Sequence, residues 1–137
     1  MKFWLPVAGL LLCTSAQAQE NAIDARLSQC MNGASTTPAL SECYGSASKA
    51  WDKEMNTQYN RLMKKLTGEP KAKLRVAQRN WLAYRDSWMA TSKAFFAQRQ
   101  GTMTPLSVGA QSVSLVRNQA LMLQSLNKGS CANPDDC

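Results

Sequence analysis

The sequence predicts an all-α fold, a small antiparallel bundle of three long helices plus a short N-terminal helix, stapled by disulfides. Along three long segments of the 137 residues, apolar side chains recur at steps of three or four, the period of an amphipathic helix. No segment shows the strict alternation of a half-buried strand. Glycine and proline stand between the segments, and short turns between long helices favour antiparallel packing.

The first 18 residues are expected to be a cleaved secretory signal that takes no part in the fold. Lys2 precedes an apolar run, and residues 16–18 form an A-x-A cleavage site. Lipid attachment at Cys13 is the alternative, but Leu12 is bulky where lipoprotein signals carry a small residue. The run is too short to span a bilayer comfortably, and no later stretch is apolar enough. The mature chain is therefore predicted to begin after Ala18 and to be periplasmic or secreted.

Residues 21–31 are expected to form the short N-terminal helix, which the stretch "NGASTTP" ends. Pro38 suits the first turn of the first long helix, with Thr36 or Thr37 as its cap. This helix is predicted over about 38–67 because apolar residues keep the helical period there. Its apolar stripe consists of Leu40, Ala47, Trp51, Met55, Tyr59, Leu62 and Leu66.

Gly68 ends that helix, and Pro70 can start the second long helix, which is expected to run to about Arg99. A third long helix is expected over about 106–126, with Gly109 as a weak point because glycine disfavours helix. The apolar stripes of these two helices are expected to face the core. They consist of Leu74, Ala77, Trp81, Tyr84, Trp88 and Phe95 in the second helix, and Val113, Val116, Leu121 and Leu123 in the third.

The helical domain is thus predicted over residues 19–126, followed by an irregular tail over 127–137. Signal cleavage leaves four cysteines, an even number that indicates two disulfides in an exported chain. Short loops favour local pairing, Cys30 with Cys43 and Cys131 with Cys137. The alternative pairing joins the tail to the N-terminal segment.

The residue inventory argues against an enzyme. There is no histidine, which excludes Ser-His-Asp and Cys-His catalytic groups and histidine-ligated metal sites. No glycine-rich phosphate loop occurs, and the few acids stand mostly beside Lys or Arg, so no cofactor and no metal are expected. The formal net charge is +7, or +6 once Lys2 is removed. An anionic envelope surface or an acidic protein suits this charge better than nucleic acid, which is not expected as a partner outside the cytoplasm.

The stretch 77–86, "AQRNWLAYRD", threads polar side chains between aromatic ones. On a helix, Arg85 falls on the stripe that carries the tryptophans, so a buried guanidinium there needs partners. We expect Arg85 to bond Asp52 or Asn56 of the preceding helix within a polar layer. The residues assigned to this layer are Asp52, Asn56, Tyr59, Gln78, Arg79, Trp81, Arg85, Asp86 and Arg117. A structural lock that sets helix register and a solvent-facing binding patch are both open interpretations.

Two stretches, "AWDKEMNTQYNRLMKKL" and "KLRVAQRNWLAYRD", carry a family resemblance. They are similar to the LprI-like family of lysozyme inhibitors, and the resemblance extends over about residues 30–123. The matching positions are Ala50, Asp52, Met55, Asn56, Tyr59 and Leu62, then Ala77, Gln78, Arg79, Trp81, Tyr84, Arg85 and Asp86. Ser114 and Arg117 fit a third-helix element of the family more loosely, and Cys30 and Cys43 resemble its N-terminal cysteine pair. Relatives often carry two further cysteines, at positions that here read Met89 and fall near Gly109.

The resemblance implies an exported, non-enzymatic binding protein that inhibits lysozyme-like muramidases, with a lysozyme-like enzyme as its protein partner. The alternative is a periplasmic envelope-interaction or immunity module that uses a basic surface. The candidate binding residues flank the turns of the bundle, and they are Lys64, Lys65, Lys71, Lys73, Arg75 and Arg99. Cations at these helix ends also suit the helix dipole without any partner. The sequence indicates neither the oligomeric state nor the identity of the target.

Overall fold

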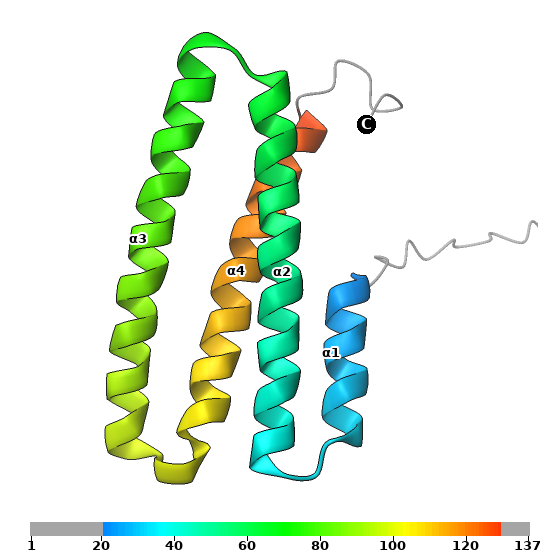
Figure 1. Ribbon diagram of the computed structural model, residues 1–137, viewed down its shortest axis with the longest axis vertical. Coiled ribbons are helices and arrows are strands. Elements are labelled where there is room, and N and C mark those ends of the chain that lie inside the picture. Colours follow the sequence, from blue (N-terminus) through cyan, green and yellow to red (C-terminus); the bar gives the residue numbers. More distant parts are fainter. Residues whose placement is uncertain (1–20, 130–137) are drawn as a thin grey trace, which may run out of the picture.

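The computed structural model describes residues 21–129, which form an all-helical bundle (Figure 1). Its elements are α1 (Ala22–Gly33), α2 (Thr37–Lys65), α3 (Gly68–Arg99), the short 3₁₀ helix η1 (Gly101–Met103) and α4 (Thr104–Gly129). The three long helices run antiparallel in succession, and the short α1 lies beside α2 (Figure 1). The prediction of three long helices and one short N-terminal helix is confirmed.

The order of the helices in space differs from their order in the chain. Helix α1 packs on α2, α2 packs mainly on α4, and α4 packs on α3. Helices α2 and α3 are joined by a tight turn, yet they make little direct contact along their lengths (Figure 1). Helix α4 therefore lies between the two preceding long helices and holds the bundle together.

Local capping explains where α2 begins. The Thr36 side chain accepts a hydrogen bond from the Ala39 N–H at 3.3 Å, and Pro38 occupies the first turn. The last turn carries Lys64 and Lys65, where the helix dipole favours cations. The turn after α2 uses Gly68 with φ of +59°, a left-handed conformation that glycine adopts at little cost.

The last helix is longer at both ends than the apolar pattern predicts. It continues through 127–129, which were expected to belong to the irregular tail, so that part of the prediction is wrong. Asn127 is buried, and its side-chain amide donates to the Gln58 carbonyl at 2.9 Å and to Gln58 Oε1 at 2.8 Å. Packing against α2 thus overrides the weak helix propensity of the local sequence.

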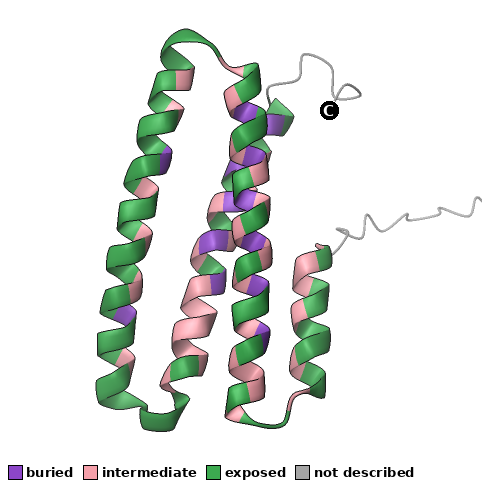
Figure 2. Cartoon of the chain, in the orientation of Figure 1, coloured by how far each residue is buried: buried purple, intermediate pink, exposed green. Residues whose placement is uncertain are grey.

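The core lies between α2 and α4 (Figure 2). Its largest fully buried side chains are Trp51, Met55 and Leu62 of α2. Helix α4 supplies the facing half of the core with Val113, Val116, Ala120 and Leu123. These residues follow the helical periods read from the sequence, so the predicted core faces of α2 and α4 are confirmed.

The predicted core face of α3 is confirmed for Leu74 and Trp81, which pack partly buried against the core, and is wrong for its other members. The fully buried residues of this 32-residue helix are Gln78 and Ser92, both polar. Tyr84 and Phe95 are 53% and 50% exposed, and Trp88 is exposed as well. The reason lies in the topology, because α3 packs mainly against α4 and too little surface is available to cover its whole apolar stripe.

Cys30 and Cys43 form a disulfide with their Cα atoms 5.7 Å apart, as the sequence predicts. This bond ties the end of α1 to the first turns of α2. Helix α1 has no fully buried residue of its own, although Ile23 and Leu27 pack against the core. The predicted pair Cys131–Cys137 lies outside the described residues.

Gly109 marks a close approach of α4 to α2. A Cβ atom at this position would lie 2.8 Å from the Tyr44 Cβ and 3.1 Å from its Cγ. The Tyr44 Cβ is fixed to the backbone, so it can yield only if one helix shifts. Packing therefore favours glycine here, which adds a reason for this residue beyond the low helix propensity that the sequence indicates.

Replacing Gly109 with alanine is expected to lower the free energy of unfolding by roughly 1–3 kcal/mol, because overpacking outweighs the gain in helix propensity. Gly45→Ala is the matched control, since Gly45 lies within α2 and a Cβ there meets nothing within 4 Å. That variant should be stabilised by up to about 1 kcal/mol. Chemical denaturation of both variants tests this, and a stabilised Gly109→Ala variant would contradict the close contact.

None of the helices within residues 21–129 combines the length and the apolar character that a membrane span requires.

Candidate binding surface

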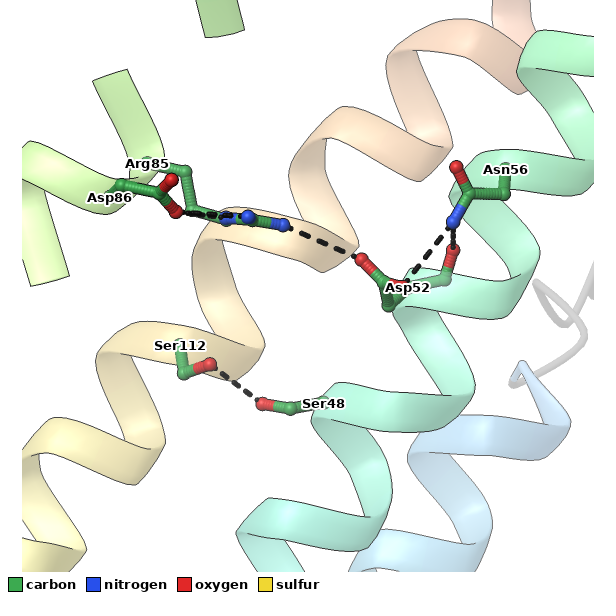
Figure 3. Close-up of polar contacts among 6 residues, drawn as sticks. All are labelled: Ser48, Asp52, Asn56, Arg85, Asp86 and Ser112. Atoms are coloured by element: carbon green, nitrogen blue, oxygen red, sulfur yellow. Dashed lines mark hydrogen bonds and ion pairs between the residues drawn. The ribbon is translucent and has the colours of Figure 1, made fainter. Parts of the chain in front are cut away.

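Arg85 joins α3 to α2 at the surface of the bundle (Figure 3). Its Nη1 lies 3.6 Å from Asp52 Oδ1, while its Nε and Nη2 donate to Asp86 Oδ1 at 3.0 and 2.9 Å. The guanidinium also lies 5.7 Å from the centroid of Trp81. The shorter bonds thus connect neighbours on α3, and the longer ion pair connects α3 to α2. The Arg85 side chain keeps 28% of its surface exposed, so it is only partly buried.

Asn56 joins this cluster through Asp52, because its amide donates to Asp52 Oδ2 at 3.3 Å, but most of the remaining residues assigned to the polar layer lie elsewhere (Figure 3). Asn56 bonds within its own helix to the Asp52 carbonyl at 2.9 Å, and Tyr59 packs partly buried against the core. Gln78 is buried elsewhere and accepts from Gln119 Nε2 at 2.9 Å. Arg79 is exposed. The expected contact between Arg85 and Asp52 is present, but a single buried layer between α2 and α3 is not, because α4 separates most of these two helices.

Arg117 belongs to a different contact, which the sequence did not indicate. Its Nε lies 2.9 and 3.1 Å from the two carboxylate oxygens of Asp24, and its Nη2 forms an ion pair at 2.8 Å. The hydrogen bond that Arg117 donates to Asp24 raises the pKa of Arg117, against a smaller opposing effect of burial. The guanidinium also lies 5.5 Å from the Trp51 centroid. Arg117 thus fastens α1 and α4 over the core, and no sequence period connects positions 93 residues apart.

Two more polar contacts lock α4 in place. The Ser48 hydroxyl donates to the Ser112 hydroxyl at 2.9 Å, between α2 and α4 (Figure 3). Near the other end of the same interface, Gln58 donates to Glu54 at 2.6 Å while accepting from Asn127. Polar contacts between helices, which the structural-lock interpretation expected around Arg85, thus also occur between α2 and α4.

Replacing Arg85 with alanine is expected to cost about 1 kcal/mol or less, because a partly exposed ion pair contributes little. A deeply buried guanidinium would have cost about 3 kcal/mol or more. Arg79→Ala on the same helix is the control and should be within about 0.5 kcal/mol of the parent protein. Thermal and chemical unfolding of both variants measures the change in the free energy of unfolding. A decrease of more than about 3 kcal/mol for Arg85→Ala would indicate that the guanidinium is buried after all.

The predicted basic residues do not form one patch. Lys64, Lys65, Lys71, Lys73 and Arg75 lie around the turn between α2 and α3, whereas Arg99 lies at the far end of α3 (Figure 1). Lys73 is paired with Glu69 at 2.7 Å. Lys65 also lines a small polar pocket of about 140 Å³ between the ends of α2 and α4, together with Arg61 and Lys128. One end of the bundle is therefore strongly basic.

A row of exposed apolar side chains runs along α3. Its members are Val76, Tyr84, Trp88 and Phe95, which we call the α3 ridge. Tyr84 and Trp88 stack with their ring centroids 6.2 Å apart, and the Trp88 indole N–H donates to Gln111 of α4 at 2.9 Å. Sequence analysis missed this surface because an exposed aromatic stripe has the same period as a buried one.

The described residues offer no evident reaction centre. Within residues 21–129, no group of three or more Cys, Asp or Glu side chains is placed to hold a metal ion. Asp24 and Asp86 are bonded to arginines, and Glu54 accepts from Gln58. The surface features with recognisable chemistry are the α3 ridge and the basic end, both suited to binding a macromolecule.

Comparisons with known proteins agree with the helical fold described above and identify the family. The chain matches no curated protein. A crystal structure of an uncharacterised protein from Burkholderia thailandensis superimposes with a TM-score of 0.74 at 27% identity; the match covers 80% of this chain and 55% of that one. This chain thus spans little more than half the length of that neighbour. The sequence profile described as Lysozyme inhibitor LprI matches residues 28–123. That match covers most of the helical bundle, and the chain belongs to the LprI family.

Proposed function

We propose that this protein is an exported binding protein that inhibits lysozyme-like muramidases. The observation that carries the proposal is the match of the lysozyme inhibitor LprI profile over residues 28–123. The physical character of the described residues supports it, since a rigid helical bundle with an exposed aromatic ridge is suited to recognition. The sequence of residues 1–18, with its A-x-A site, supports delivery to the compartment in which such enzymes act.

An inhibitor of this kind acts by occupying the cleft in which the glycan binds. Muramidase clefts contain a pair of catalytic carboxylates, so a bound inhibitor gains from cations and from apolar surface that displaces water. Helix α3 offers both kinds of group, since its exposed rings include Phe95 and the Arg99 guanidinium lies 4.8 Å from that ring. Inhibition then requires no chemistry by the inhibitor itself.

The mature protein, residues 19–137, is expected to inhibit strongly basic lysozymes only weakly. Its net charge of +6 opposes another basic protein at long range, so inhibition should improve as salt screens the repulsion. Titrating the protein against several lysozymes at low and moderate salt, with cell-wall clearing as the readout, tests this. Absence of inhibition of every muramidase tried would reject the proposed function.

The basic end of the bundle favours a second candidate, an envelope-interaction or immunity module. Arg61, Lys65 and Lys128 gather there beside the turn that holds Lys64 and Lys71. Attraction between this end and anionic envelope material should weaken with salt, the reverse of the trend expected with a basic lysozyme. Salt-sensitive retention on anionic envelope material, combined with no muramidase inhibition, would favour this candidate.

A further inference from the structure

Helix α3 carries most of the chain's excess positive charge. Its residues 68–99 include seven Lys and Arg against two Asp and Glu, which gives +5 of the formal net +7. Lys73 is paired with Glu69 and Arg85 with Asp86, and both pairs remain accessible to solvent. A partner with negative charge on its own surface is therefore favoured along this helix.

The α3 ridge adds an apolar contact surface to this basic helix. From Val76 to Phe95 it extends about 28 Å at 1.5 Å per residue. Its rings are held in place, because Tyr84 stacks on Trp88 and Trp88 is hydrogen-bonded to Gln111. The Arg99 guanidinium lies 4.8 Å from the Phe95 centroid and places a cation at the end of the ridge. Pre-organised aromatic side chains of this kind lose little entropy when they bind.

The charge also limits what can occupy the ridge. A second copy of the chain, packed α3 against α3, would bring two helices of net +5 together. Like charges across an interface oppose association, so a self-pair is disfavoured. A long groove with acidic walls can cover the apolar side chains of the ridge and place negative charge beside its cations.

We propose that the α3 ridge enters the glycan cleft of a muramidase whose cleft and rim are acidic. This inference rests on the proposed inhibitor function and names the surface and the partner class that it requires. A helix laid into a groove is a recurring mode of recognition, and the cleft already contains the carboxylates of the catalytic pair. The preferred target is then an acidic muramidase rather than a strongly basic lysozyme.

Variants on the two sides of α3 test the inference. Tyr84→Ala and Phe95→Ala each remove one exposed ring of the ridge. Leu82→Ala is the matched control, because Leu82 is exposed on the same helix but lies two residues before Tyr84 and so points to the opposite side. The mature protein and these variants are titrated at low salt against two purified muramidases, one with net negative and one with net positive charge. Calorimetry gives the affinity, and thermal unfolding monitors the fold.

The unaltered protein should inhibit the acidic enzyme more strongly than the basic one. Each ring variant should weaken binding to the acidic enzyme at least about tenfold, as expected for an aromatic anchor, while Leu82→Ala stays within about twofold. Arg99→Glu, at the exposed end of the ridge beside Phe95, should also weaken binding and reduce its dependence on salt. This charge variant keeps the inference testable if a ring variant loses its fold.

These experiments distinguish failure of the proposed surface from failure of the proposed inhibitor function. If the protein inhibits the acidic enzyme and the ring variants bind it as well as the parent does, the ridge is not the surface, yet the inhibitor function stands. Stronger inhibition of the basic enzyme overturns the acidic partner class. If the unaltered protein inhibits neither enzyme, the proposed function fails and this inference fails with it.

Discussion

Replacing Trp51 with alanine should lower the free energy of unfolding by about 3–5 kcal/mol, the largest loss expected for a single residue of this bundle. Trp51 is 0% exposed, at the centre of the contact between α2 and α4. Its removal leaves a cavity that the surrounding long helices can close only in part. Urea denaturation with tryptophan and circular dichroism signals followed in parallel measures the loss.

Trp88→Ala provides the matched control for this change. Trp88 is exposed on α3 and makes one hydrogen bond, so its loss should cost roughly 1–2 kcal/mol. Equal losses for the two variants would contradict a core confined to α2 and α4. A further variant, Trp51→Phe, should lose less than Trp51→Ala, since within residues 21–129 the buried Trp51 N–H has no hydrogen-bond partner to forfeit.

Removal of the Cys30–Cys43 disulfide should lower the free energy of unfolding by roughly 3 kcal/mol in the chain-entropy model. The bond joins two residues that are 13 positions apart, and without it the unfolded chain gains the entropy of an open loop. The double variant Cys30→Ser/Cys43→Ala is expected to loosen α1 first. That helix has no fully buried residue, and its other ties are the Asp24–Arg117 ion pair and partly buried apolar contacts. Limited proteolysis should therefore cut near α1 while α2 and α4 stay protected.

Cys131→Ser/Cys137→Ser is the control for this second prediction. It should leave the protection of α1 unchanged if the tail cysteines pair with each other. Non-reducing peptide mapping of the parent protein checks the pairing directly. A tail cysteine linked to Cys30 or Cys43 would contradict both the described bond and the predicted tail pair.

The helices could be predicted from the sequence because local physics determines them. The first long helix was expected over 38–67 and is observed over Thr37–Lys65, since a threonine cap, an N-terminal proline and a glycine after the last turn mark its ends. The α2 face of the core followed from the spacing of Trp51, Met55 and Leu62. Capping and period are local properties, and one sequence is enough to read them.

The arrangement of those helices could not be predicted in the same way. Tyr84 and Phe95 have the spacing of core residues, but whether another helix covers them depends on the position of α4. The pair Asp24–Arg117 depends on two helices that meet far apart in the chain. Gly109 was expected to weaken its helix because low helix propensity is a local property of glycine. The close approach of Tyr44 from α2, which leaves no room for a Cβ atom, is not visible in the sequence. Each of these features is set by tertiary packing, which a local pattern does not record.

The position of α4 has a consequence for how the molecule matures. A chain is made from its N-terminus, so Trp51, Met55 and Leu62 stay in water until the final helix, Thr104–Gly129, has been synthesised. Before that point the facing half of the core, which α4 supplies, is missing, and helices without tertiary packing are marginal in water. The last quarter of the protein is therefore the step that commits it to folding. A polypeptide that stops before α4 is expected to remain an open chain, recognised by chaperones and proteases, rather than a smaller version of the bundle.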